Sequence, residues 1–230
     1  MNKEIKKIFE EVPRTYELVN HILTLGFDIL LRKKAAREAV KLGGTQWLDV
    51  CCGTGEMAVN LLRLGRGSSK IFAADFSMPM LGLAHQKPEA AKISFILCDA
   101  GILPFKSESF DLITISFATR NINTSRDDLI KTLSEFHRVL RSGGRFVNLE
   151  TSQPKYWLIR KLMHLYIKLT VRWIGRLISG SKTGYGYLSD TVPRFYTAEE
   201  FSDIILRAGF SKVDFKKSFF GAAAIHRGVK

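Results

Sequence analysis

The chain has 230 residues, and 35 lysines and arginines against 22 aspartates and glutamates give it a formal net charge of +13. This length suits one ordinary domain, and 46% hydrophobic with 25% charged residues excludes a disordered or fibrous protein. Three cysteines without a CxxC pair argue against a disulfide scaffold or a zinc site, and no stretch approaches the roughly 18 apolar residues of a membrane span. No secretory signal is visible, so we expect a cytoplasmic protein whose positive charge serves a nucleic acid, an anionic membrane surface or an acidic ligand.

Apolar runs alternate with helical patterns through the first two thirds of the chain. An N-terminal helical cap is expected over about residues 1–43, and residues 141–144 are expected to form a turn. Strands that alternate with helices in this way predict a parallel sheet covered by helices on both faces. The predicted strands are Thr45–Cys51, Ser69–Asp75, Ile93–Asp99, Phe110–Phe117 and Arg145–Glu150, and the predicted helices are Gly55–Leu64, Met78–Gln86 and Arg126–Leu140.

The last third has a different organisation, which includes a basic helical insertion over about 155–197. No linker interrupts the chain, so we expect residues 1–230 to form a single domain. The patterns predict a long or broken helix, a Gly/Tyr-rich loop, another helix and an antiparallel strand pair: Lys155–Ile178, Ser179–Thr197, Ala198–Ala208, and Ser211–Phe219 with Gly221–Arg227.

A glycine-rich turn joins the first predicted strand to its helix. Gly53 and Gly55 allow a sharp turn and the close approach of a ligand, and with Ala58 they match the GxGxx(G/A) spacing of dinucleotide-binding turns. On its own this match is weak, because a tight turn in any α/β protein gives the same pattern about as often.

Acids stand near three neighbouring strand ends, and they narrow the choice of ligand. Asp49 precedes the turn, Asp75 ends the second strand and Asp99 ends the third. A carboxylate in the place of Asp75 can accept hydrogen bonds from both ribose hydroxyls, and Asp99 falls near where an adenine would lie. An acid beside the turn suits a ligand with positive charge and no phosphate, such as S-adenosylmethionine (SAM), better than NAD with its two phosphates.

This pattern resembles that of the class I SAM-dependent methyltransferases. Segments spread over the whole chain are similar, more narrowly, to the ubiquinone/menaquinone biosynthesis C-methyltransferase family: Tyr16–Asn20, Leu103–Phe105 with Ser109–Asp111, Ile115–Ile122, Arg138–Arg145 with Leu149–Ser152, Tyr185–Leu188, and Ile225–Gly228. The resemblance implies a Rossmann-like α/β fold, with a seven-stranded, mostly parallel sheet and a terminal antiparallel strand pair. It implies SAM as the cofactor, no metal, and these cofactor-binding residues: Asp49, Cys51, Gly53, Thr54, Gly55, Ala58, Asp75, Phe76, Asp99, Ala100 and Ser116.

The chain also departs from the family pattern, mostly in the N-terminal part that family members use to cover the site. These departures leave the acceptor more open than the fold. In the N-terminal part, Glu17 replaces an Asp of the family, Val19 a Met, Asp28 a His and Leu31 a Trp. Near the glycine turn, Ala58 replaces a Thr, and Cys51 or Cys52 replaces a Gly.

The activity that the resemblance implies is methylation of a ring carbon in a demethylated quinol, such as demethylmenaquinol or a related ubiquinone precursor. A deprotonated ring oxygen pushes charge onto the neighbouring carbon, which attacks the methyl group in line. Arg120, just beyond the fourth strand, is expected to stabilise this phenolate, with Asn121 holding it in place. An Arg-Asn pair after a strand is otherwise a helix-cap and surface salt-bridge feature.

The general base and the cover of the site rest on fewer signals. Tyr16 is a candidate lid residue or a half-buried packing residue. Among five histidines, His21 is the first to test as a base, although a single histidine is more often structural. A water held by Arg120 or Tyr16 is the alternative base. Glu150 and Ser152 are candidate neighbours of Arg120, with a surface acid as the alternative for Glu150.

The helix predicted over 155–178 combines a broad apolar surface with basic residues and contains no acid. A cationic stripe beside Trp and Leu suits a helix that lies on anionic lipid. Because polyprenylated quinols reside in the bilayer, we expect peripheral contact with the inner face of the membrane, with a lid helix on the sheet or across a homodimer as the alternative. The stripe is Arg160, His164, Lys168, Arg172 and Arg176.

Three rival functions remain open. An RNA methyltransferase would use the +13 charge for phosphates, although no recognition module or base-stacking motif is visible, so nucleic acid is a less favoured partner. An NAD-dependent oxidoreductase would use the same glycine turn. A membrane-binding protein with an inactive cofactor fold is the third, and the intact set of Asp49, Gly53, Gly55 and Asp75 argues against it.

Overall fold

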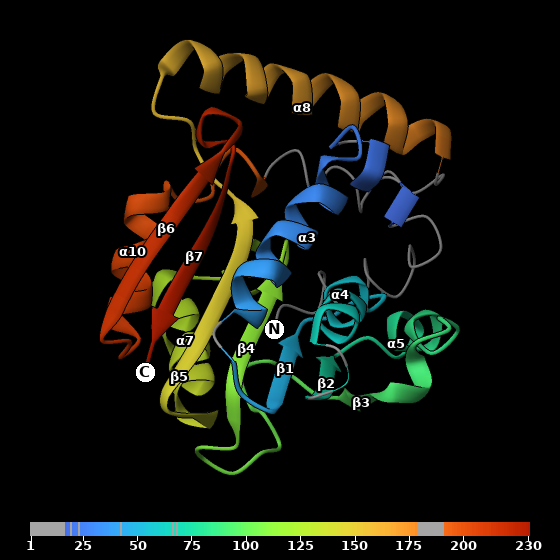
Figure 1. Ribbon diagram of the computed structural model, residues 1–230. Helices are drawn as coiled ribbons and strands as arrows, with labels where there is room; N and C mark the ends of the chain where they lie inside the picture. Colours follow the sequence, from blue (N-terminus) through green and yellow to red (C-terminus); the bar gives the residue numbers. More distant parts are fainter. Residues whose placement is uncertain are drawn as a thin grey trace.

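The computed structural model describes residues 17–18, 20–22, 24–41, 43–65, 67, 69–178 and 191–230. Its centre is a seven-stranded sheet in the order β3-β2-β1-β4-β5-β7-β6 (Figure 1). The strands from β3 to β5 are parallel, and β7 pairs antiparallel with both β5 and β6, which confirms the predicted fold class. The strands are β1 (Gln46–Val50), β2 (Lys70–Asp75), β3 (Ile93–Leu97), β4 (Phe110–Ser116), β5 (Leu140–Thr151), β6 (Lys212–Ser218) and β7 (Ala223–Val229).

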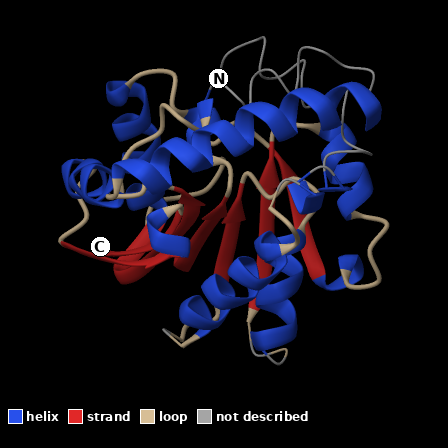
Figure 2. Cartoon of the chain, turned by 90° about the horizontal axis from the view of Figure 1, so that it is seen from above, coloured by secondary structure: helices blue, strands red, loops and turns tan. Residues whose placement is uncertain are grey.

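Helices cover both faces of the sheet (Figure 2). Neighbouring strand residues point to opposite faces, so Trp47 packs on one side and Leu48 on the other. The first side carries α3 and α4, and the second carries α7 and α10. The helices are α3 (Phe27–Val40), α4 (Glu56–Gly65), α5 (Met78–Ala84), α6 (Thr119–Ile122), α7 (Arg126–Val139), α8 (Trp157–Ile178) and α10 (Ala198–Arg207), with the 3₁₀ turns η1 (Ala90–Lys92) and η2 (Phe219–Gly221).

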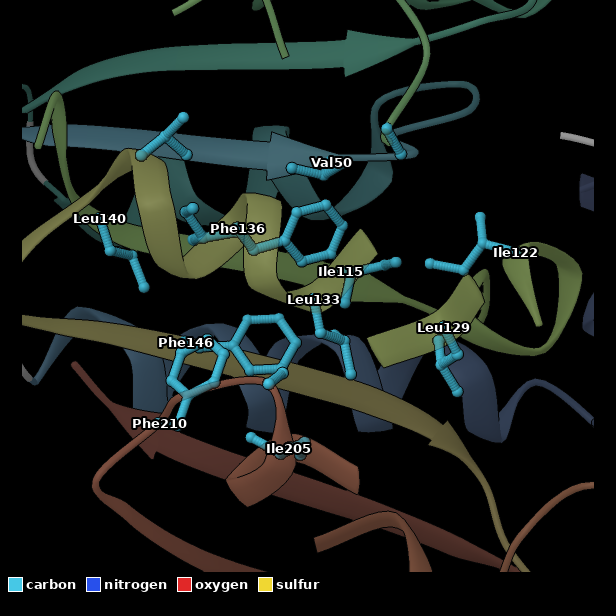
Figure 3. Close-up of a cluster of buried hydrophobic side chains, with 14 of the residues drawn as sticks. Val50, Ile115, Ile122, Leu129, Leu133, Phe136, Leu140, Phe146, Ile205 and Phe210 are labelled. Atoms are coloured by element: carbon cyan, nitrogen blue, oxygen red, sulfur yellow. The ribbon is translucent and has the colours of Figure 1, made fainter. Parts of the chain in front are cut away.

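Aromatic side chains fill the core between the sheet, α7 and α10. Figure 3 shows Phe136 of α7 and Phe146 of β5 in this core, with Phe210 and Ile205 beside Phe146. The ring centroids of Phe136 and Phe146 lie 5.9 Å apart, and those of Phe146 and Phe210 lie 5.2 Å apart. This packing holds β4 and β5 at fixed positions, and Arg120 follows β4 whereas Glu150 lies near the end of β5.

The predicted turn at residues 141–144 is wrong, because these residues belong to β5. Phe110 pairs with Leu140, but Leu112 pairs with Arg145, so the strand carries extra residues in an irregular register. Gly143 has a φ of +73°, a conformation that glycine adopts readily, and its N–H donates to the carbonyl of Lys230 at 3.2 Å. A Ser-Gly-Gly sequence indicates a turn equally well, and only the pairing with the rest of the sheet distinguishes the two.

The long predicted helix is continuous, and α8 extends from Trp157 to Ile178. It lies along the edge of the molecule beyond the carboxyl ends of the parallel strands and next to α3 (Figure 1). Residues 179–190 of the predicted loop lie outside the described residues, as does Tyr16.

Candidate active site

The glycine turn after β1 is fixed by an acid from the next strand. The carboxylate of Asp75, at the end of β2, accepts hydrogen bonds from the N–H of Gly53 at 2.8 Å and of Ser77 at 2.9 Å. Gly53 and Gly55 have φ values of +55° and +82°, and a Cβ at Gly55 would lie 3.3 Å from the Cβ of Ala84. The turn therefore needs glycine at both positions, as the spacing predicts.

A narrow cleft, called the cofactor cleft below, opens above this turn at the carboxyl ends of the neighbouring strands β1 and β4. From β1 the chain continues to β2 and β3 on one side of the sheet, and from β4 it continues to β5 on the other. Open α/β sheets bind their ligands at such a switch point. Six of the predicted cofactor residues line the cleft together with Asn121. The lining residues are Glu17, Arg32, Cys51, Cys52, Gly53, Thr54, Glu56, Asp75, Phe76, Met80, Ser116, Ala118, Asn121 and Ile122.

The other predicted cofactor residues lie around this cleft rather than in its wall. Ala100 lines a small side cavity that it shares with Cys51, Asp75 and Phe76. Asp49 and Ala58 are buried, and Gly55 is the last residue of the turn. Asp99 is exposed, and its Oδ1 accepts a hydrogen bond from the N–H of Gly101 at 2.8 Å.

Asp49 is a buried acid with an incomplete set of partners. Its Oδ1 accepts a hydrogen bond from the Thr114 hydroxyl at 2.8 Å, whereas its Oδ2 has no hydrogen-bond partner among the described residues. Burial raises the pKa of Asp49 to about 7, against the opposing effects of Thr114 and of the positive charge of Arg32. Such a group is costly to ionise without a nearby cation.

Among the described residues, acids outnumber bases in the wall of the cleft. Glu17, Glu56 and Asp75 line it with one guanidinium, that of Arg32, and Asp49 is buried at the end of β1 nearby. This charge distribution fits a ligand that carries positive charge, such as the ammonium and sulfonium of SAM, and opposes a pyrophosphate. Burial and the nearby aspartates also raise the pKa of the Cys51 and Cys52 thiols well above the usual value, which disfavours the reactive thiolate form.

The N-terminal segment covers one side of the cleft through Glu17. Its carboxylate accepts hydrogen bonds from the Thr54 hydroxyl and from Lys87, whose Nζ lies 3.1 Å away and also pairs with Glu56. The sequence identified Glu17 only as a departure from the family pattern. Its position against the glycine turn shows that the longer side chain still reaches the cofactor region.

A second cavity, mainly apolar, lies between α3, α8 and the start of β7. Its volume is about 320 Å³, within the ordinary range for a small-molecule site. Its charged lining residues are Asp28, Arg32 and Arg120. The lining residues are Asn20, Thr24, Leu25, Phe27, Asp28, Leu31, Arg32, Phe117, Arg120, Thr151, Met163, Tyr166, Ile167, Val192, Phe219, Ala222 and Ala223.

The cleft and the apolar cavity meet at two places in the chain. Arg32 lines both. The segment after β4 lies between them, because Ser116 and Asn121 line the cleft whereas Phe117 and Arg120 line the cavity. A group bound in the cleft can therefore reach a molecule in the cavity only across this boundary.

Arg120 is a buried cation at this boundary. Its side chain is 6% exposed, and its Nη1 donates to Oε1 of Glu150, which is 1% exposed, at 2.8 Å. The backbone N–H of Arg120 also donates to Oε2 of Glu150, at 3.2 Å. This burial rules out the surface salt bridge for the Arg-Asn pair and the surface acid for Glu150. Ser152 and Asn121 are buried too, and Asn121 lines the cofactor cleft.

His21 lies behind the cavity wall rather than in it. Its Nδ1 is 2.8 Å from Oδ2 of Asp28. Arg32 also donates to this oxygen, and the Thr24 hydroxyl donates to Oδ1 of the same carboxylate. Asp28 does line the cavity. The role of His21 as a base stays a prediction, and the structure connects this histidine to the cavity through Asp28.

The sequence reasoning missed Arg32. A signal for it was present, because Asp28 and Arg32 are four residues apart on a helix and such opposite charges form an ion pair on one face. The two residues make that pair at 2.6 Å, and both are buried.

The sheet order, the glycine turn and the acid-rich cleft define a class I SAM-dependent methyltransferase. In fold, the structure is similar to a SAM-dependent methyltransferase from Thermotoga maritima, with a TM-score of 0.69 at 21% identity over 98% of this chain and 99% of that one. It is also similar to PigF with SAH, with a TM-score of 0.60 at 16% identity over 85% of this chain and 53% of that one.

Sequence comparison gives the family. The model of the ubiE/COQ5 methyltransferase family matches residues 1–230, and the chain belongs to this family. It is 34% identical to a demethylmenaquinone methyltransferase of Lactiplantibacillus plantarum, over 98% of this chain and 95% of that one. It is 33% identical to a ubiquinone/menaquinone biosynthesis C-methyltransferase of Desulfotalea psychrophila, over 98% of this chain and 90% of that one.

Proposed function

We propose that this enzyme transfers a methyl group from SAM to a ring carbon of a demethylated menaquinol or a related polyprenylated quinol. The two relatives are named for such reactions, and the chain aligns with nearly the whole of each. The observation that carries the proposal is the buried guanidinium of Arg120, which is paired with Glu150 and lines a cavity whose other walls are mostly apolar. A ring with one ionisable oxygen and an apolar tail has the chemistry that such a cavity selects.

The cleft residues fit the donor. Bound SAM supplies an electrophilic methyl group on its sulfonium. The N–H groups and glycines of the turn allow its close approach, Asp75 and Phe76 lie where a ribose and an adenine bind in this fold, and the buried Asp49 favours positive charge nearby. Asp75 accepts backbone hydrogen bonds from Gly53 and Ser77, and lone pairs that its carboxylate does not use for the backbone would serve the ribose.

The cavity residues fit the acceptor. Arg120 would hold the ring oxygen as a phenolate, because its fixed positive charge in a buried site stabilises the negative charge that develops there. Glu150 holds the guanidinium by accepting a hydrogen bond from its Nη1, and its second carboxylate oxygen accepts one from the backbone N–H of Arg120. The ring carbon then forms a bond to the methyl group as the sulfonium bond breaks, and the ring loses one proton. In this proposal His21 serves as the base and Tyr16 covers the site.

The test of this function is transfer of tritium from methyl-labelled SAM. With a short-tailed demethylmenaquinol we expect the label in the organic extract, and with total RNA as acceptor we expect none above background. Label in RNA and none in the quinol would contradict the proposal and favour the rival RNA methyltransferase.

We also propose that α8 brings the enzyme to an anionic membrane. Within the part of the chain that the structure describes, no helix is long and apolar enough to cross a membrane. The outward face of α8 nevertheless exposes large apolar side chains beside Lys161 and Lys168, which suits a helix lying at a lipid surface. The exposed apolar residues are Trp157, Leu158, Leu162, Leu165, Tyr166 and Leu169.

The same helix forms one wall of the cavity, so a membrane contact through α8 would place the cavity next to the lipid. Met163, Tyr166 and Ile167 line the cavity, as does Phe219, which is 43% exposed. Phe220, beside it, is 79% exposed. In this proposal a quinol enters from the bilayer between α8 and the η2 turn that carries Phe219 and Phe220. The predicted polar stripe does not face the solvent as a whole, because Arg160 and His164 are half-buried and His164 bonds to Gln153 at 2.8 Å.

Leu165→Asp is expected to weaken binding to vesicles of phosphatidylcholine and phosphatidylglycerol by about tenfold. The change removes an exposed leucine that the lipid would bury on binding. Cosedimentation with the vesicles measures this. Leu206→Asp on α10 is the matched control, because Leu206 is 44% exposed and Leu165 51%, and it should bind like the wild type. Equal binding by all three proteins, or a dimer in light scattering that Leu165→Asp dissociates, would contradict the membrane contact and favour an interface between two copies.

A further inference from the structure

Arg32 is a buried cation that the proposed mechanism does not yet use. Its side chain is 9% exposed, and it lines both the cofactor cleft and the apolar cavity. Its Nη1 donates to Oδ2 of Asp28 at 2.6 Å, and its guanidinium carbon lies 5.2 Å from the centroid of the Phe117 ring. These contacts hold the guanidinium at the boundary between the two cavities.

Besides its sulfonium, the donor carries two charged groups on its methionyl end, an ammonium and a carboxylate. The cleft must provide partners for both groups. Carboxylates for the ammonium are present, because Glu17 and Glu56 line the same part of the cleft as Thr54. Among the described residues that line the cleft, Arg32 is the single cation. Lys87 lies outside this lining and pairs with Glu17 and Glu56, and Arg120 lines the apolar cavity alone.

We propose that Arg32 binds the carboxylate of the methionyl end of SAM. This inference rests on SAM as the donor in the proposed function, but not on the identity of the acceptor. A guanidinium has five N–H donors in a planar fork, so Arg32 can keep its hydrogen bond to Asp28 and still hold a second carboxylate.

Asp28 has a matching role as the anchor of Arg32. Three donors converge on its carboxylate, from His21, Thr24 and Arg32. Burial raises the pKa of Asp28, but the hydrogen bond from Thr24, the charge of Arg32 and the hydrogen bond from His21 outweigh it and hold the pKa below its usual value. The carboxylate thus stays ionised and keeps the guanidinium in one orientation. Because that guanidinium lies between the cavities, a carboxylate bound to it would orient the donor so that the methyl group faces the cavity.

The test compares two ligands that differ in the methionyl end. S-adenosylhomocysteine has the amino-acid group, and 5′-methylthioadenosine lacks it. By calorimetric titration, Arg32→Met should lower the affinity for S-adenosylhomocysteine by roughly ten- to hundredfold, the range for a lost hydrogen bond to a charged group. The affinity for 5′-methylthioadenosine should fall by less than about twofold. Arg120→Met, at a guanidinium that lines the other cavity, should leave the ratio of the two affinities unchanged.

Arg32→Lys makes the test independent of folding. A lysine keeps the ion pair with Asp28 but loses the planar fork, so the same selective loss for S-adenosylhomocysteine is expected to a smaller degree. An equal loss for both ligands would show a structural role and overturn the inference. So would an unchanged affinity for S-adenosylhomocysteine with a raised KM for the quinol, which would place Arg32 on the acceptor. A wild type that binds neither ligand would overturn the donor assignment itself, and this inference with it.

Discussion

Replacing Arg120 with methionine is expected to lower kcat for methyl transfer by about 10²–10³-fold, the usual effect of removing one group that stabilises a developing oxyanion. The affinity for S-adenosylhomocysteine should stay within about twofold of the wild type, because Arg120 lines the apolar cavity and not the cofactor cleft. Initial rates with a short-tailed demethylmenaquinol and calorimetric titration measure the two quantities.

A second variant separates this catalytic effect from a loss of stability. In Arg120→Met the carboxylate of Glu150, 1% exposed, loses its cationic partner, which costs about 3–5 kcal/mol for buried pairs in general. The double variant Arg120→Met/Glu150→Gln removes both charges, so it should recover most of the thermal stability and none of the activity. Wild-type rates in either variant would show that the phenolate is stabilised elsewhere.

Asp49→Asn is expected to stabilise the ligand-free protein above pH 7. The pKa of Asp49 is raised from 3.8 to about 7, so between these values the folded state holds a proton that the unfolded state has released. The free energy of unfolding therefore falls as the pH rises from about 4 to 7, and the full cost is present above pH 7. A rise of about three units in the pKa of Asp49 corresponds to a loss of about 4 kcal/mol in the free energy of unfolding, as an upper bound.

Chemical denaturation between pH 4 and pH 9 measures this effect. The variant should exceed the wild type most above pH 7, and the difference should close as the pH falls towards 4. SAM should bind the variant about tenfold more weakly at pH 8, since the variant lacks the negative charge beneath the cleft. Asp203→Asn, at an exposed position on α10, is the matched control and should show no such difference. A variant less stable than the wild type at pH 8 would contradict the account of Asp49.

The sequence predicted the parts of the site that follow directly from strand ends. Asp75 and the glycines of the turn lie where their spacing placed them, because parallel strands put their carboxyl ends on the same edge. The antiparallel pair at the end of the chain was also predicted, because two short segments that are close together in the sequence form it.

The partners of the two buried guanidinium groups were harder to predict. Arg120 and Glu150 are 30 residues apart, and they meet because β4 and β5 pair in the register that sets Ser116 against Leu149. That register depends on the irregular start of β5, which the sequence indicated as a turn. Arg32 is close to Asp28 in the chain, but its burial depends on the packing of α3 against the sheet, which no local pattern shows.

The position of the transferred methyl group tests the central claim most directly. We expect that carbon-13 NMR of demethylmenaquinol, treated with the enzyme and SAM labelled in its methyl group, will show the label bonded to a ring carbon. Label on a ring oxygen, or no label in the quinol while S-adenosylhomocysteine binds the enzyme, would contradict the proposed function.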